Sequence, residues 1–127
     1  MKRMLIVDDS PSWVRYHESA VKQLFGDIYE IDTASSAVEA NDKIYLNAEE
    51  PYDVILTDMQ METNFLPLFA GEWLIEQIQN MKEYSATRIV IISATSNIAS
   101  IAKKYTVEFI PKYSCRDVEI YRDFFAV

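Results

Sequence analysis

Short apolar runs alternate with amphipathic segments along the whole chain. Three of these runs, at residues 5–7, 54–56 and 89–92, are continuous rather than alternating. Strands that are covered on both faces have this pattern, which is typical of a parallel sheet. The run at 29–34 alternates more strictly, as an edge or half-covered strand does. The pattern predicts five strands, at residues 4–7, 29–34, 52–57, 88–93 and 107–111.

A helical pattern follows each strand. The first helix begins after Ser10, a good capping residue, and ends at Gly26. A serine followed three positions later by an acidic residue, at 36–39 and 114–117, predicts capping boxes for the second and fifth helices. Because parallel neighbours need crossovers that cover both faces, five such units predict an α/β fold, a doubly wound sandwich. The length fits one domain over residues 1–127.

Composition and charge narrow the class of protein. Half of the residues are hydrophobic and 25% are charged, which is typical of a globular chain rather than a disordered one. The 12 basic and 20 acidic residues give a net charge of −8, so direct binding to nucleic acid is not expected. The lone Cys115 excludes an intrachain disulfide. We find neither a signal-peptide core nor a run long enough for membrane insertion, and we expect a cytoplasmic protein.

Charged and hydroxyl side chains stand where the predicted strands end. Asp8 and Asp9 follow the first strand and Asp58 follows the third. Ser93 ends the fourth strand, and Lys112 follows the fifth. Each residue alone fits a cap, a turn or the surface. In an open parallel sheet, however, ligands bind beyond the carboxyl ends of the strands, so these five residues together predict a site.

Three carboxylates at one edge of a sheet need a counter-charge. At ~4 Å and an effective dielectric of ~20, each like-charge pair costs about 4 kcal/mol. A divalent cation removes this cost, and ligands that are all oxygen favour a hard ion such as Mg²⁺. Magnesium neutralises phosphoryl oxygens, and a carboxylate can attack phosphorus to form an acyl phosphate. Lys112 would then balance the charge of the phosphoryl group, and Ser93 would donate to one of its oxygens.

This arrangement closely resembles the receiver domain of two-component response regulators, over essentially the whole chain. The resemblance implies a flavodoxin-like (βα)5 sandwich whose five-stranded parallel sheet has the order 2-1-3-4-5. The positions that carry it are the acid pair Asp8 and Asp9, the phosphoacceptor Asp58, the hydroxyl of Ser93, the lysine Lys112 and, three residues before it, the switch aromatic Phe109.

The resemblance implies a phosphorylation-dependent signalling switch rather than an enzyme. Asp58 would accept a phosphoryl group from a histidine kinase or a phosphotransfer protein. Mg²⁺ would be held directly by Asp9, Asp58 and the backbone carbonyl of Met59, and by Asp8 mainly through water.

The resemblance also implies how the signal leaves the site. Ser93 would move toward the phosphoryl group and Phe109 would turn inward, which would remodel the face formed by the fourth helix, the fifth strand and the fifth helix. A stand-alone receiver would signal by contact with a downstream protein target. Pairing of two copies through the final helix stays open.

Two features depart from the family pattern. Receivers commonly have a proline after the lysine, whereas here Pro111 precedes Lys112 and Tyr113 follows it. The geometry of the loop into the last helix is therefore not predicted. In addition, Gly71 lies thirteen residues after Asp58, so the segment 59–70 is longer than the family usually has. We expect its apolar residues either to pack onto the third helix or to form a surface for a partner.

Alternative functions remain at this stage. A degenerate receiver would act as a phosphorylation-independent scaffold, although all the site residues are intact. A phosphatase of the haloacid-dehalogenase type also uses an aspartate at a strand end, but it needs an acid two residues later, where this chain has Gln60. The single histidine, His17, lies on the apolar stripe of the first helix and fits a core position.

Overall fold

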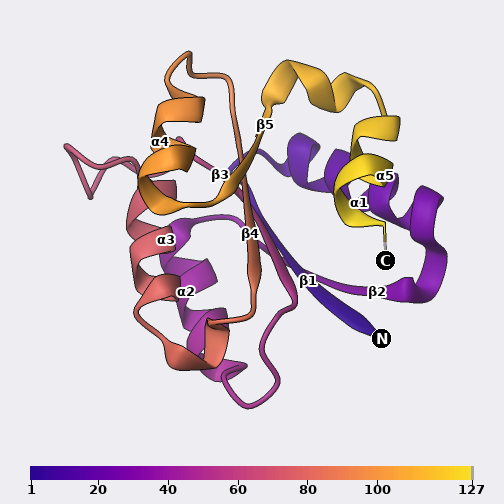
Figure 1. Ribbon diagram of the computed structural model, residues 1–127, viewed down its shortest axis with the longest axis horizontal. Helices are drawn as coiled ribbons and strands as arrows, with labels where there is room; N and C mark the ends of the chain where they lie inside the picture. The colour runs from indigo at the N-terminus through magenta and orange to yellow at the C-terminus, as the bar shows by residue number, and fades with distance from the viewer. Residues whose placement is uncertain (127) are drawn as a thin grey trace.

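The computed structural model describes residues 1–126 and has a five-stranded parallel sheet at its centre (Figure 1). The strands stand in the order β2-β1-β3-β4-β5, which confirms the expected doubly wound α/β topology. The observed bounds agree with the predicted ones to within two residues. The strands are β1 (Lys2–Val7), β2 (Tyr29–Ala34), β3 (Val54–Asp58), β4 (Arg88–Ser93) and β5 (Glu108–Pro111).

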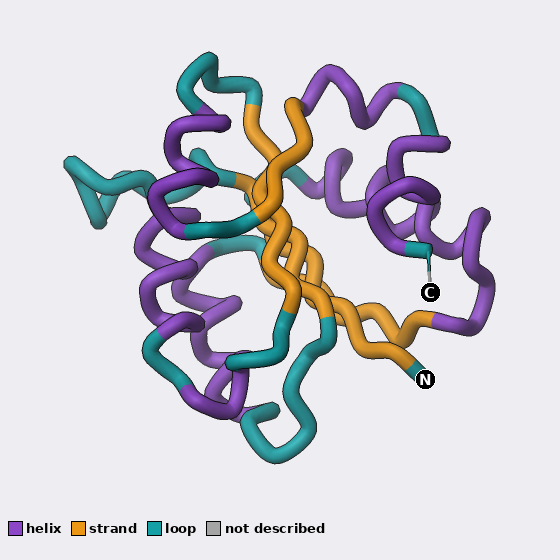
Figure 2. Tube along the Cα trace, in the orientation of Figure 1, coloured by secondary structure: helices purple, strands orange, loops and turns teal. Residues whose placement is uncertain are grey.

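Helices cover both faces of the sheet (Figure 2). Helices α1 (Pro11–Phe25) and α5 (Glu119–Phe125) lie on one face. Helices α2 (Ala37–Leu46), α3 (Ala70–Gln79) and α4 (Ile98–Tyr105) lie on the other. Short 3-10 turns stand at Gly26–Ile28, Lys82–Tyr84 and Lys112–Arg116. Among residues 1–126, no helix is both long enough and apolar enough to cross a membrane.

The sheet divides the apolar core into two clusters. Alternate side chains of a strand point to opposite faces, so Leu5 and Ile55 pack beneath α2, α3 and α4. Ile6 and Leu56, their neighbours in the chain, pack beneath α1 and α5. Because both faces are covered, the central strands bury consecutive residues, which accounts for their continuous apolar runs.

The two predicted capping boxes have different outcomes. The hydroxyl of Ser36 accepts the backbone N–H of Glu39 at 3.0 Å, but the Glu39 carboxylate accepts from Ser35 instead of closing the box on Ser36. The capping box predicted at 114–117 does not form. The chain after β5 first forms a 3-10 turn that buries Cys115, and α5 begins only at Glu119, whose backbone N–H donates to the Asp117 carboxylate at 3.0 Å.

The long segment between β3 and α3 projects from the body of the molecule (Figure 1) and is fixed at two points. The carboxylate of Glu62 accepts the first two backbone N–H groups of α2, at 2.8 and 3.2 Å. The ring of Phe65 stacks on Trp73 of α3 with centroids 4.2 Å apart. The segment therefore packs onto the third helix, which is one of the two arrangements expected from the sequence. Leu66, in its outer part, is exposed.

Candidate functional site

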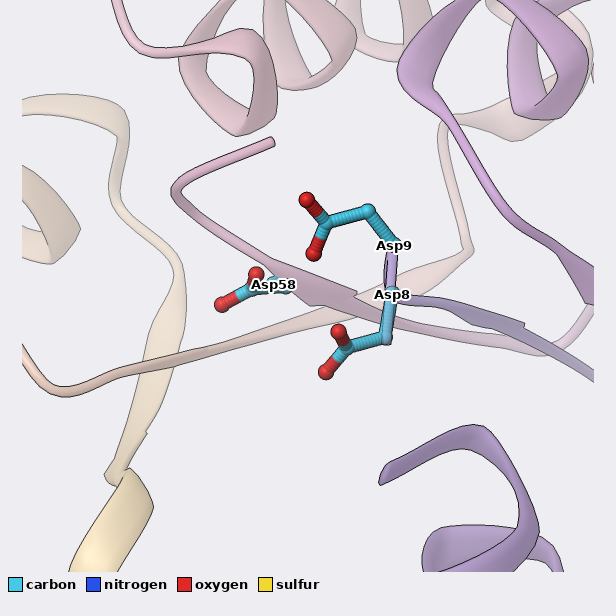
Figure 3. A group of neighbouring side chains, drawn as sticks. All are labelled: Asp8, Asp9 and Asp58. Carbon is cyan, nitrogen blue, oxygen red and sulfur yellow. The ribbon is translucent and has the colours of Figure 1, made fainter. Parts of the chain in front are cut away.

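Three carboxyl groups meet at the carboxyl edge of the sheet (Figure 3). Val7 of β1 pairs with Thr57 of β3, so the acids that follow them leave the sheet at the same level. One oxygen from each of Asp8, Asp9 and Asp58 lies within 4.8 Å of the other two. Asp8 and Asp58 are only 1% and 6% exposed, and Asp9 is exposed. The prediction that these three acids share one pocket is confirmed.

The carboxylate of Asp8 is held at both oxygens. Its Oδ1 accepts the backbone N–H of Ser10 at 2.9 Å, and its Oδ2 lies 3.3 Å from Lys112 Nζ and 3.8 Å from His17 Nε2. Burial by itself would raise the pKa of Asp8, but the imidazole, the N–H group and the ammonium together hold this pKa below its ordinary value. Asp8 is therefore an anion at neutral pH.

The pKa of Asp58 shifts in the opposite direction. Burial, followed by repulsion from Asp8, raises the pKa of Asp58 from 3.8 to about 7, and the Lys112 ammonium 3.6 Å away offsets this only in part. When its carboxyl groups are ionised, the pocket therefore carries more negative charge than the Lys112 ammonium balances. A divalent ion bound between the carboxylates would relieve the repulsion, and the three acids can hold such an ion.

Lys112 directly follows β5 and reaches the two buried carboxylates from the side of α1. Its ammonium also lies 4.9 Å from the centroid of the Trp13 ring. The side chain is 17% exposed, so the aromatic ring and the acids together restrict it. Trp13 thus borders the site as well as packing against the core.

The end of β3 is fixed by close contact with α3. A Cβ on Gly71 would lie 2.5 Å from the carbonyl oxygen of Asp58, so only glycine fits there. The Gly71 N–H donates to the carbonyl of Met59 at 3.0 Å. This carbonyl, which the family resemblance implies as a metal ligand, keeps only its second lone pair for an ion.

Ser93 and Phe109 lie on the strands that complete this edge. Ser93 ends β4, is 1% exposed, and accepts the backbone N–H of Thr95 at 3.1 Å. Within residues 1–126 no hydrogen bond joins its hydroxyl to the three acids. Phe109 is half-buried in β5, pairs with Ile91 and packs on the core beneath α4.

The contacts of His17, unlike its core position, were not predicted from the sequence. It is 2% exposed, as expected of a core histidine, but its ring faces Asp8 on one side and Tyr121 of α5 on the other. Helical periodicity places it on the buried stripe together with Trp13, four residues earlier. Periodicity alone does not tell which side chains of other elements it meets.

The sequence profile of the response regulator receiver domain matches residues 4–114. The chain belongs to the response regulator receiver family. Its acidic pocket stands at the sheet edge where the resemblance led us to expect it. As a receiver, the protein is a member of a phosphoacceptor family of two-component signalling rather than a conventional enzyme.

Solved receiver structures share the fold at low sequence identity. The phosphorylated cyanobacterial phytochrome response regulator RcpA has a TM-score of 0.78 and 18% identity, covering 97% of this chain and 92% of its own. The Mn²⁺-bound form of the response regulator Rcp1 has a TM-score of 0.75 and 16% identity, covering 98% and 94%. A receiver domain protein of Clostridium thermocellum has a TM-score of 0.67 and 19% identity, covering 98% and 93%.

Proposed function

We propose that this receiver is a phosphorylation-dependent switch whose phosphoacceptor is Asp58. The observation that carries the proposal is the juxtaposition of three carboxylates within 4.8 Å of one another with an ammonium 3.6 Å from Asp58. An ion pair with no further role would not need three acids, two of them buried, beside one lysine. A phosphoryl acceptor with a divalent ion explains the whole set.

The proposed transfer is a nucleophilic substitution at phosphorus. A carboxylate oxygen of Asp58 forms a bond to the phosphorus of a phosphohistidine or an acyl phosphate. The bond from phosphorus to the donor nitrogen or oxygen breaks, and its electron pair leaves with the donor. Lys112 stays beside the new acyl phosphate and balances its charge, while the Ser93 hydroxyl donates to a phosphoryl oxygen.

The residues present fit Mg²⁺, because all the available donors are oxygens and the buried carboxyl groups of Asp8 and Asp58 repel each other when both are ionised. Asp9 and Asp58 would hold the ion directly and Asp8 mainly through water. A backbone carbonyl of the turn after Asp58 would add an oxygen, from Met59 or from the following Gln60. Mg²⁺ supplies charge neutralisation at the phosphoryl oxygens when it is bound. The Mn²⁺-bound form of Rcp1, a structure with the same fold, supports a divalent ion.

The phosphoryl donor would be a histidine kinase or a phosphotransfer protein, and the output would be contact with a downstream protein target. Ser93 and Phe109 lie on neighbouring strands at the edge that leads to α4 and α5. Movement of Ser93 toward the phosphoryl group would leave room for Phe109 to turn inward. The face formed by α4, β5 and α5 would then differ between the two states, either for a partner or for a second copy.

Intact-mass measurement with Mg²⁺ and acetyl phosphate tests the proposal. We expect one added phosphoryl group on the wild type and none on Asp58→Asn. The matched control is Asp32→Asn, which removes a carboxylate bound by Lys43 and Tyr52 and should leave phosphorylation unchanged.

Each other outcome identifies an alternative function. A folded wild type that gains no mass would act as a scaffold. Rapid consumption of acetyl phosphate with no retained phosphoryl group would indicate a phosphatase. A phosphoryl group retained by Asp58→Asn would contradict the assignment of the acceptor.

A further inference from the structure

A buried polar chain joins the acidic pocket to α5. Asp8, His17 and Tyr121 are 1%, 2% and 0% exposed. The Nδ1 atom of His17 lies 2.6 Å from the hydroxyl of Tyr121, and its Nε2 lies 3.8 Å from Asp8 Oδ2. The imidazole thus stands between a proposed metal-binding carboxylate and a helix of the proposed output face.

The charge on Asp8 fixes the direction of this chain. An anion 3.8 Å from Nε2 favours the tautomer that carries its proton there, because the positive end of the N–H dipole then faces the carboxylate, although the distance is longer than a hydrogen bond. Nδ1 is then the acceptor, and the Tyr121 O–H donates to it. The tyrosine hydroxyl therefore orients the ring, and the ring in turn orients Asp8.

Helix α5 depends on a few bonds of this kind for its place. It spans only Glu119–Phe125, and its first backbone N–H, from Glu119, donates to the neighbouring Asp117 carboxylate at 3.0 Å. Its last turn is fixed by the hydroxyl of Tyr29, which donates to the carbonyl of Phe125, and by Arg88, which donates to the carbonyl of Phe124. Toward the pocket, the side-chain bond that holds it is the one from Tyr121 to His17.

We propose that His17 is a positioning residue for Asp8 and that its bond to Tyr121 couples divalent-ion binding in the acidic pocket to the packing of α5. The inference rests on the proposed function, because it assumes that the pocket takes an ion. Coupling of this kind is reciprocal: loss of the Tyr121–His17 bond lowers affinity for the ion, and the bound ion strengthens that bond and so holds the pocket end of α5 in place. It would give the site a route to α5 through α1, separate from Ser93 and Phe109.

A pair of matched variants isolates the coupling. Tyr121→Phe and Tyr29→Phe each remove one buried hydroxyl that bonds α5 to the body, but only Tyr121 is linked to Asp8. Mg²⁺ affinity is measured by isothermal calorimetry on each folded variant. Tyr121→Phe removes the hydrogen bond that orients His17, the neighbour of a carboxylate that would hold the ion mainly through water, and should raise the Kd about three- to tenfold. Tyr29→Phe should keep the wild-type Kd.

Two further readouts separate positioning from general destabilisation. His17 is the only histidine, so ¹⁵N-histidine labelling gives the signals of one ring. We expect Nε2-protonated shifts that move on addition of Mg²⁺ in the wild type and lose their fixed tautomer in Tyr121→Phe. Mg²⁺ should also slow amide exchange in α5 of the wild type but not of His17→Leu. If Tyr121→Phe does not fold, His17→Leu and the wild-type spectra carry the test.

The outcomes distinguish this inference from the proposed function. If the folded wild type binds no divalent ion, both are wrong. If the wild type binds Mg²⁺ and Tyr121→Phe binds it equally well with an unchanged His17 spectrum, the coupling is wrong and the proposed function stands. An equal loss of affinity in Tyr29→Phe would likewise overturn the coupling, because it would trace the effect to α5 stability alone.

Discussion

Neutralising Asp58, the proposed phosphoacceptor, should stabilise the metal-free protein, contrary to the usual effect of removing a buried polar group. The pKa of Asp58 is about 7 in the folded protein, against 3.8 for an ordinary aspartate, because burial and Asp8 disfavour its charge. The folded state therefore holds this proton more tightly than the unfolded state does. The free energy of unfolding then falls as pH rises from about 4 to about 7.

The size of the effect follows from the shift. At about 1.4 kcal/mol per pKa unit, a shift of about three units costs about 4 kcal/mol once Asp58 is fully ionised. Asn has nearly the same shape and no charge, but it gives up the ion pair with Lys112. We therefore expect Asp58→Asn to be about 1–4 kcal/mol more stable than the wild type at pH 8 in EDTA. At pH 4 the difference should vanish.

Urea unfolding, followed by circular dichroism at pH 4 and pH 8, measures this difference. Asp32→Asn is the control, because the bonds from Lys43 and Tyr52 lower the pKa of Asp32 despite its partial burial. That variant should lose stability at pH 8. Saturating Mg²⁺ should stabilise the wild type more than Asp58→Asn. If Asp58→Asn is destabilised equally at both pH values, the repulsion argued for the pocket does not exist.

Three other predictions concern the pocket and its supports. The affinity for Mg²⁺, measured by calorimetry, should rise as the pH increases from 6 to 8, because Asp58 must lose its proton to bind the ion. Below the Asp58 pKa of about 7 the rise should reach about tenfold per pH unit. An affinity that does not change with pH would contradict ionisation of this group on binding. Glu62→Gln should lose about 1 kcal/mol in urea unfolding, because it weakens the cap on α2, and should still be phosphorylated. Gly71→Ala should lose about 1–3 kcal/mol and slow phosphorylation by acetyl phosphate, since its Cβ displaces the end of β3; wild-type values for both would refute that contact.

The strand ends were the most predictable part of the site. Parallel strands bring their carboxyl ends to one edge, so Asp8, Asp9 and Asp58 could be grouped as soon as their strands were recognised. Lys112 could be included for the same reason, although the loop after it could not be predicted. Strand position is set by local sequence and burial pattern, and both can be read from a single chain.

Contacts between side chains of elements far apart in the chain could not be predicted from the sequence. Glu62, in the segment after β3, caps the start of α2, and neither local sequence pattern indicates this contact. His17 satisfies the helical periodicity of a core residue, but its contacts with Asp8 and Tyr121 depend on how α1 and α5 pack. The predicted start of α5 was wrong because the chain first places Cys115 in the core through a 3-10 turn. Burial of this side chain outweighs the local capping pattern.

We infer above all that the carboxyl group of residue 58 carries the phosphoryl group. Borohydride reduces an aspartyl phosphate to homoserine, so peptide mapping after treatment with acetyl phosphate, Mg²⁺ and borohydride locates the acceptor. We predict homoserine at position 58 and at no other aspartate, with none formed in EDTA. Homoserine at position 8 or 9, or its absence from folded protein that binds Mg²⁺, would contradict the claim.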